Sequence, residues 1–191
     1  MSDAHQSYDT IIVGARVAGT AAAVLLARAG IRILLVDKAA FPADTISTHI
    51  VLSGGTRVLA RMGVLDRLEE AGGVRYSKMR TLGPTFDYSA ELESNTEDYR
   101  GLCLGRLKMD AAMLAIARSF DSVSVREQFR VTDLLIENGE VTGIRGEDAT
   151  GVHEFHSTLA IGADGMRSAV AKIAHEKIGK DRGGVFRRKD V

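Results

Sequence analysis

Apolar residues first form short runs along the chain and then recur at helical spacing, which is the pattern of a β-α-β unit. The run Ile11–Val13 meets Gly14, which predicts a buried strand over Tyr8–Val13 that enters a tight turn. Small and apolar residues follow at helical spacing, and Gly30 is placed to end that helix. A second buried strand is predicted over Ile31–Val36. The short connections favour a parallel pair of strands.

The rest of the chain predicts more helices and a β-meander. After a loop at 41–49, helices are expected over 50–62 and 64–71, short strands within 78–104, and a helix that begins near Arg106. A strand at 123–125 precedes three antiparallel strands at 129–136, 141–145 and 152–155, and Asn138-Gly139 is a strong hairpin signal between the first two. A further buried strand at 159–161 and a helix over 168–174 complete the pattern. The fold class is therefore α/β, with a mainly parallel sheet and an antiparallel β-meander.

The C-terminal segment differs in character from the rest of the chain. Residues 175–191 are rich in charged residues and show no hydrophobic period. A segment of this kind buries too little apolar surface to fold with the domain. We expect one domain over 1–174 and a polar tail, outside the fold, over 175–191.

Composition narrows the function classes. Lys plus Arg and Asp plus Glu number 25 each, and aromatic residues make up 5%, which argues against a nucleic-acid partner. No apolar run approaches the roughly 20 residues of a membrane span. The single cysteine, Cys103, cannot form an internal disulfide, which fits a cytoplasmic location.

The glycine-rich turn after the first strand carries the candidate chemistry. The segment Gly14-Ala15-Arg16-Val17-Ala18-Gly19 is similar to the dinucleotide fingerprint G-x-G-x-x-G, with Arg16 at the second glycine position. Helix N-terminal amides there would face a pyrophosphate, and Arg16 adds a cation that could contact a phosphate. Asp37, at the end of the second strand, could accept hydrogen bonds from ribose hydroxyls. The competing interpretation is a β-α-β unit that binds no nucleotide.

Other reactive residue types receive no assignment. His49, in the 41–49 loop, could shuttle a proton, but a histidine bonded to loop backbone is the simpler interpretation. His153 and His156 lack acidic or cysteine partners at metal-ligand spacing, so no metal site is predicted. No Ser, His and Asp arrangement suggests a hydrolase. The sequence predicts no catalytic residue.

Five segments of the chain together give a specific resemblance. The segment Tyr8–Gly19, followed by Leu35–Lys38 and the loop Phe41–His49, resembles the opening of FAD-dependent monooxygenases and oxidoreductases. The group is similar to para-hydroxybenzoate hydroxylase and to geranylgeranyl reductases. Gly105–Asp110 resembles the Arg-x-x-x-Asp segment of these enzymes, and Ile161–Ser168 resembles their Asp-Gly motif. The resemblance covers about residues 8–174 and implies a Rossmann-like FAD-binding domain of the glutathione-reductase type.

The resemblance also implies a cofactor and site roles. FAD would be the cofactor, with Asp37 on the adenosine ribose, Arg106 near the phosphates and Asp164 near the ribityl and pyrophosphate groups. The expected cofactor-binding residues are Gly14, Ala15, Arg16, Val17, Ala18, Gly19, Asp37, Lys38, Arg106, Asp164 and Gly165. NAD(P)H would be the electron donor, and the substrate a small organic molecule.

Two departures from the family pattern leave alternatives open. Lys172 stands where the family commonly has an arginine after its Asp-Gly motif, and family members are roughly twice as long as this chain. We therefore expect a truncated N-terminal portion of a flavin monooxygenase. A flavin-dependent double-bond reductase, a catalytically silent FAD-binding fragment and a protein that binds NAD on the same fingerprint remain alternatives. The sequence predicts no oligomeric state.

Overall fold

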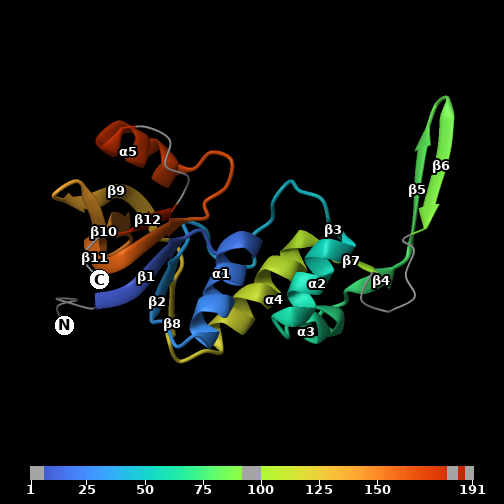
Figure 1. Ribbon diagram of the computed structural model, residues 1–191, viewed down its shortest axis with the longest axis horizontal. Coiled ribbons are helices and arrows are strands. Elements are labelled where there is room, and N and C mark those ends of the chain that lie inside the picture. Colours follow the sequence, from blue (N-terminus) through green and yellow to red (C-terminus); the bar gives the residue numbers. More distant parts are fainter. Residues whose placement is uncertain (1–6, 92–99, 180–184, 188–191) are drawn as a thin grey trace. The chain divides into compact units, whose positions relative to one another are not determined.

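The described residues of the computed structural model form two compact units. The description covers residues 7–91, 100–179 and, for the backbone alone, 185–187. One unit comprises Met1–Phe41 with Met113–Val191, and the other comprises Pro42–Ala112. Figure 1 labels their elements.

The first unit is built on a mixed sheet whose parallel part matches the predicted β-α-β unit. The strands lie in the order β8 (Val123–Arg126), β2 (Ile33–Val36), β1 (Ser7–Val13), β11 (Gly151–Gly162), β10 (Glu140–Asp148) and β9 (Arg130–Glu137), and β12 (Val185–Arg187) also pairs with β11. Neighbours from β8 to β11 run parallel, whereas β10 pairs with both β11 and β9 in antiparallel fashion. The predicted α/β class, with a mostly parallel sheet and an antiparallel meander, is confirmed.

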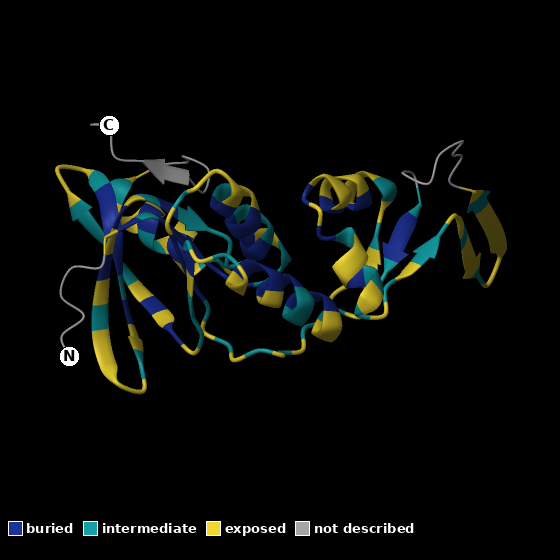
Figure 2. Ribbon diagram, turned by 90° about the horizontal axis from the view of Figure 1, so that it is seen from below, coloured by how far each residue is buried: buried dark blue, intermediate teal, exposed yellow. Residues whose placement is uncertain are grey.

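Helices cover both faces of this sheet. All four residues of β2 are buried, as its uninterrupted apolar sequence requires. Helix α1 (Val17–Arg28) packs on β1 and β2, and its buried residues include Ala23, Val24 and Ala27. The apolar side chains on the other face of these strands form a core with Val170 and Ala174 of α5 (Ala169–Ile178). Figure 2 marks buried residues in both the strands and the helices of this unit.

The meander differs from the prediction in one strand. Asn138 and Gly139 both have positive φ, 52° and 80°, as the predicted hairpin turn requires. The separate strands expected at 152–155 and 159–161 are, however, one strand, β11. Its first half pairs with β10 and its second half with β1, so that the polar residues between the expected strands lie where it changes partner.

Regular secondary structure continues past residue 174, the predicted end of the domain. Helix α5 continues to Ile178, four residues past its expected end at 174. The backbone of Val185–Arg187 pairs with β11. The last turn of α5 and the whole of β12 therefore lie within the expected 175–191 tail. Residues 180–184 and 188–191 are outside the described part, so for them the tail stays a prediction.

The second unit combines short helices with small sheets. Its elements are β3 (Ile50–Val51), α2 (Ser53–Arg61), α3 (Leu65–Glu70), β4 (Val74–Tyr76), β5 (Lys78–Gly83), β6 (Phe86–Glu91), β7 (Gly101–Cys103) and the start of α4 (Arg106–Arg118), which continues into the first unit. The helix predicted over 50–62 is wrong at its start, because Ile50 and Val51 pair with β7. The helix near Arg106 begins there as predicted.

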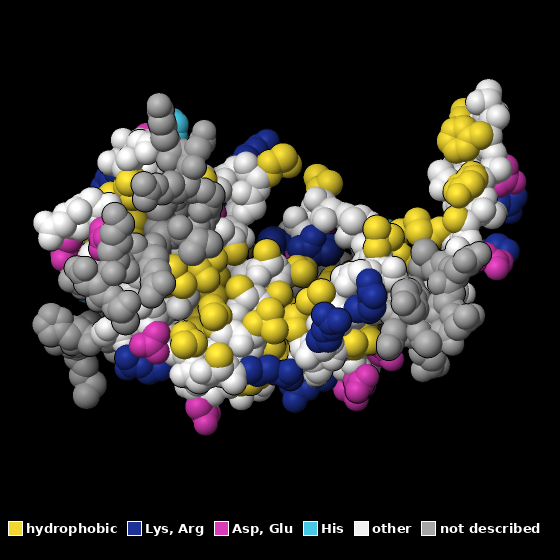
Figure 3. Space-filling view, viewed as in Figure 1, with side chains coloured by type: hydrophobic (Ala, Val, Ile, Leu, Met, Phe, Trp, Pro, Cys, Tyr) yellow, Lys and Arg dark blue, Asp and Glu magenta, His cyan; other side chains and the backbone are white. Residues whose placement is uncertain are grey.

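Strands β5 and β6 form an amphipathic hairpin that pairs with no other described strand. Their register places Met79, Phe86 and Tyr88 on one face, and Phe86 and Tyr88 are more than half exposed. The other face carries cross-strand ion pairs, of which Lys78 with Glu91 is one. Figure 3 shows apolar side chains along this hairpin. Across the described residues, no helix is long and apolar enough to cross a membrane.

Candidate functional site

Three parallel strands of the first unit end together, and the predicted fingerprint begins at this edge. Val13 of β1 is in register with Val36 of β2 and with Gly162 of β11. The Gly14 amide donates to the Val36 carbonyl (2.8 Å), and the Ala163 amide donates to the Val13 carbonyl (2.7 Å). Ligands of open α/β sheets bind at this carboxyl edge.

Gly14 and Gly19 let backbone segments approach one another closely. Gly14 has φ of 108°, and a Cβ built on it would lie 2.4 Å from the Ala163 carbonyl oxygen. A Cβ built on Gly19 would lie 1.7 Å from the Gly14 carbonyl oxygen. Both positions therefore require glycine, and the reason lies in the packing of the turn itself.

The N-terminus of α1 lacks the side-chain cap that α5 has. Arg16 is the N-cap residue with extended backbone, its side chain makes no capping hydrogen bond, and no acid lies in the first turn of the helix. The Thr20 hydroxyl donates to the Arg16 carbonyl (2.8 Å). An uncapped helix N-terminus presents amide donors and a positive dipole to an anion.

Asp37 closes the fingerprint turn from the end of β2. Its Oδ2 accepts from the Ala15 amide (2.7 Å), and its Oδ1 accepts from the Ala39 amide (2.8 Å). A carboxylate has about four acceptor positions, so this half-buried group can also take bonds from two hydroxyls. Asp37 thus has a structural task that the motif alone did not reveal.

Asp164 and Gly165 follow β11 at the same sheet edge, and Asp164 caps α5. Its Oδ1 accepts from the Ser168 hydroxyl (2.5 Å), and its Oδ2 accepts from the Ala169 amide (2.6 Å). The Ser168 hydroxyl in turn accepts from the Ala171 amide (2.9 Å). Ser168, the first residue of the predicted helix, could have revealed this cap. The expected contact of Asp164 with a cofactor stays a prediction.

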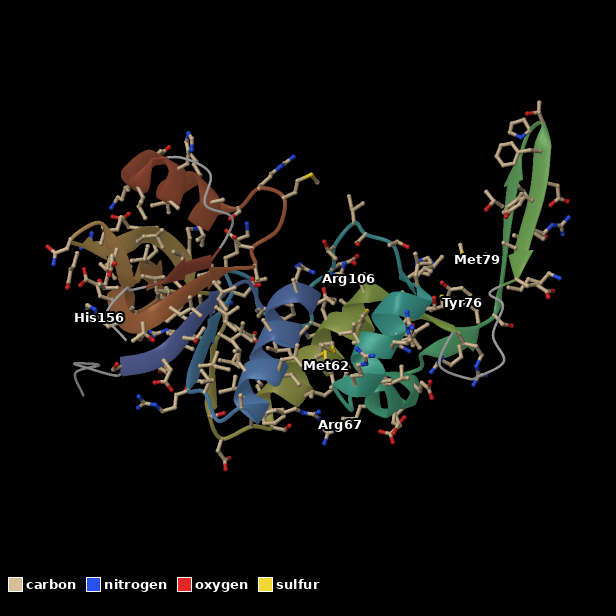
Figure 4. The ribbon with its side chains drawn as sticks, viewed as in Figure 1. Met62, Arg67, Tyr76, Met79, Arg106 and His156 are labelled. Atoms are coloured by element: carbon tan, nitrogen blue, oxygen red, sulfur yellow. The ribbon has the colours of Figure 1, made fainter. Side chains whose placement is uncertain are left out.

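The remaining predicted site residues are divided between the two units. Ala15 is buried, Val17 is half-buried, and Ala18 and Lys38 are exposed beside the fingerprint turn. Arg106 lies in the second unit, at the start of α4, where Figure 4 labels it. The first unit therefore brings together the fingerprint, Asp37, Lys38, Asp164 and Gly165. A contact of Arg106 with these residues stays a prediction.

Arg106 is held by an acid one helical turn farther along. Its Nε and one terminal nitrogen donate to the Asp110 carboxylate at 2.9–3.1 Å. Asp110 is fully buried and the Arg106 side chain is 17% exposed. The Arg-x-x-x-Asp spacing is thus explained by a bidentate ion pair on one helix face.

Phe41 and Glu127 are residues of this edge that the sequence did not assign. The Arg16 guanidinium carbon lies 5.7 Å from the centre of the Phe41 ring. The Phe41 amide donates to Glu127 Oε2 (2.8 Å). No local pattern could have revealed this arrangement, because 86 residues separate Phe41 from Glu127.

A separate charged cluster joins β8 to the meander. Arg126 donates to Asp148 Oδ2 at 2.6–2.8 Å, and Thr150 donates to Asp148 Oδ1 through its hydroxyl (2.6 Å) and its amide (2.8 Å). The Thr150 hydrogen bonds, and next the Arg126 contact, hold the pKa of Asp148 far below its usual value. Within the described parts of the chain, no group of three His, Cys, Asp or Glu residues could hold a metal ion.

Comparison with known proteins identifies the family. The chain matches the family described as "FAD binding domain" over residues 7–187. The chain belongs to this family. The match includes the whole fingerprint, Asp37 and the Asp164-Gly165 segment, and it extends past the expected boundary at residue 174.

Curated relatives of this FAD-binding chain include both reductases and monooxygenases. Digeranylgeranylglycerophospholipid reductase 2 of Methanothermobacter thermautotrophicus is 27% identical over 173 residues, which cover 87% of this chain and 42% of that protein. FAD-dependent monooxygenase paxM of Penicillium paxilli is 29% identical over 180 residues, which cover 92% of this chain and 36% of that protein. The chain thus spans less than half the length of these relatives.

Solved structures of flavoproteins share the fold. The p-nitrophenol 4-monooxygenase PnpA of Pseudomonas putida DLL-E4 superposes with a TM-score of 0.78 at 18% identity, covering 92% of this chain and 44% of that one. The myxobacterial FAD-dependent halogenase CndH gives a TM-score of 0.79 at 23% identity, covering 88% and 40%. At these identities the likeness supports the fold alone.

Proposed function

We propose that the first unit binds FAD at the carboxyl edge of its parallel strands, with the adenosine half of the cofactor next to Asp37. The observation that carries this proposal is the pairing of an uncapped α1 N-terminus with Asp37, whose Oδ2 is 2.7 Å from the Ala15 amide of the same turn. The family match supports FAD as the nucleotide.

The residues of this edge fit the two polar parts of an adenosine diphosphate. Amides at the start of α1 donate to the pyrophosphate, and Arg16, the N-cap residue of α1, adds positive charge. Asp37 accepts from ribose hydroxyls with the acceptor positions that the turn does not use. Bound flavin supplies redox chemistry, while the protein holds and orients it.

The whole-protein activity that we propose is an NAD(P)H-dependent flavin monooxygenase that acts on a small organic substrate. Relatives named as FAD-dependent monooxygenase and as squalene epoxidase support it. Flavin-dependent double-bond reduction is the second candidate, because several relatives are named digeranylgeranylglycerophospholipid reductases. NAD(P)H as donor and a cytoplasmic location belong to this proposal as predictions.

Titration calorimetry with FAD and FMN tests the binding proposal. FMN lacks the adenosine monophosphate half of FAD, so the chain should bind FAD more tightly. Equal affinity for both flavins would refute the adenosine half-site. Oxygen consumption separates the two activities, because product formation by a monooxygenase requires oxygen whereas double-bond reduction proceeds without it. If no product forms either with or without oxygen, the result would favour the alternative that this chain binds FAD without catalysing a reaction.

A further inference from the structure

The first unit holds a cation over an aromatic ring at the nucleotide edge. The Arg16 guanidinium carbon is 5.7 Å from the centre of the Phe41 ring, within the distance at which a cation is attracted by an aromatic face. Arg16 is the N-cap residue of α1, so its backbone position is fixed by the helix. Phe41 is half-buried. The side chain of Arg16 is thus oriented by a residue that follows β2.

Several contacts fix the segment that carries Phe41. The Asp37 amide donates to the Arg126 carbonyl (3.0 Å), and the Gln128 amide donates to the Ala39 carbonyl (3.1 Å). The Phe41 amide then donates to Glu127 Oε2 (2.8 Å). The stretch from Asp37 to Phe41 therefore continues the alignment of β2 with β8, and Glu127 supplies its last anchor.

We propose that Phe41 and Glu127 are positioning residues that preorganise the Arg16 guanidinium for a phosphate of the bound dinucleotide. Phe41 supports the cation through its ring, and Glu127 fixes the backbone of Phe41. An arginine side chain loses rotamer entropy when a ligand orders it, and ordering it before binding removes part of that cost. This inference rests on the proposed FAD site.

A double-mutant cycle on FAD affinity tests the coupling. Phe41→Leu keeps an apolar side chain and removes the aromatic face, and Arg16→Met keeps the stem and removes the charge. Phe41→Leu should weaken FAD binding about two- to five-fold, the range that an exposed cation-aromatic contact supports. In the Arg16→Met background, the same change should leave FAD affinity unchanged. Equal weakening in both backgrounds would overturn the proposal.

Salt dependence and rescue separate positioning from a general structural role. Added salt should weaken FAD binding less in Phe41→Leu than in the wild-type chain, because a displaced cation contributes less electrostatic attraction. Phe41→Tyr retains the ring and should restore wild-type affinity and salt dependence. Phe86→Leu is the matched control, since Phe86 is an exposed residue of the β5–β6 hairpin in the second unit. An unchanged salt dependence in Phe41→Leu would contradict the proposal.

Variants of Glu127 test the same idea without altering the ring. Glu127→Ala removes the acceptor of the Phe41 amide and should weaken FAD binding only when Arg16 is present. Glu127→Gln retains a carbonyl acceptor and should restore much of the affinity. Weakening by Glu127→Ala that persists in Arg16→Met would exclude the positioning role. Absence of FAD binding by the wild-type chain would instead refute the proposed function itself.

Discussion

Replacement of Asp37 by alanine should affect stability and cofactor binding through separate hydrogen bonds. In the folded chain, Asp37 accepts from the Ala15 and Ala39 amides at 2.7 and 2.8 Å. Ala15 is fully buried, so Asp37→Ala leaves its amide without this acceptor, at a cost of about 1–3 kcal/mol. The free energy of unfolding in urea should fall by that amount.

The cost to FAD binding adds to this loss. The ribose hydroxyls also lose their acceptor, which costs about 1–3 kcal/mol, or roughly a five- to 150-fold rise in Kd. Calorimetry under conditions where both chains are folded measures this change. The FAD affinity of Asp37→Asn should lie between those of the wild-type chain and Asp37→Ala, because the asparagine side chain retains one oxygen acceptor.

Asp9→Asn provides the matched control. Asp9 lies near the start of β1, at the opposite end of the strand, and accepts from the Arg32 amide (2.8 Å) and guanidinium. Its removal should leave FAD affinity unchanged. A folded Asp37→Ala chain with wild-type FAD affinity would refute the reasoning, because Asp37 would then serve only the turn.

Three further predictions address the turn, the cation and the attachment of α5. Arg16→Gly should weaken FAD binding and reduce its salt sensitivity in calorimetry, whereas tighter binding would mean that Arg16 obstructs the cofactor. Gly14→Ala should lower the free energy of unfolding by about 2 kcal/mol or more in urea titration, because φ is 108° and the new methyl would meet the Ala163 carbonyl; wild-type stability would contradict this. The hydrogen bond from Lys177 to Asp133 (2.6 Å) lowers the pKa of the Asp133 carboxyl below its usual value of 3.8. The ion pair therefore stabilises the fold fully above pH 3.8, and this stabilisation is lost as pH falls through the lowered pKa. The difference in unfolding free energy between wild type and Lys177→Met should therefore be largest near neutral pH and shrink in acid, and a constant difference would exclude the ion pair as its cause.

The sequence predicted the parts of the fold whose signal is local. The apolar run Ile11–Val13, the glycine after it and the stretch Ile31–Val36 predicted the β-α-β unit correctly, although β2 begins only at Ile33. Asn138-Gly139 predicted the hairpin because these residues tolerate the positive φ that the turn needs.

The misassigned strand shows where local pattern fails. His156, Ser157 and Thr158 interrupt the hydrophobic pattern, so the pattern predicts two strands where the structure has one. In the structure the Ser157 hydroxyl donates to the Leu159 carbonyl (3.0 Å), and the Thr158 hydroxyl donates to the Asp9 carbonyl (2.7 Å). These bonds let polar residues continue β11 while it changes from β10 to β1.

The candidate site was predictable in its motif and not in its supporting contacts. The positions of Gly14, Gly19 and Asp37 followed from spacing along the chain. The hydrogen bond between Phe41 and Glu127 depends on how β8 aligns with β2, and no pattern within either segment encodes it. The capping task of Asp164, by contrast, is local in sequence, because Asp164 accepts from the Ala169 amide only five residues farther along.

Backbone amide NMR of the isotopically labelled chain during FAD titration tests the central claim most directly. If the pyrophosphate binds at the start of α1 and the ribose binds Asp37, the largest shifts should occur at the amides of residues 15–19 and 37–39, and FMN at equal concentration should leave these amides largely unchanged. Shifts in this region that are equal for FMN and FAD, or FAD-induced shifts confined to residues outside it, would contradict the account.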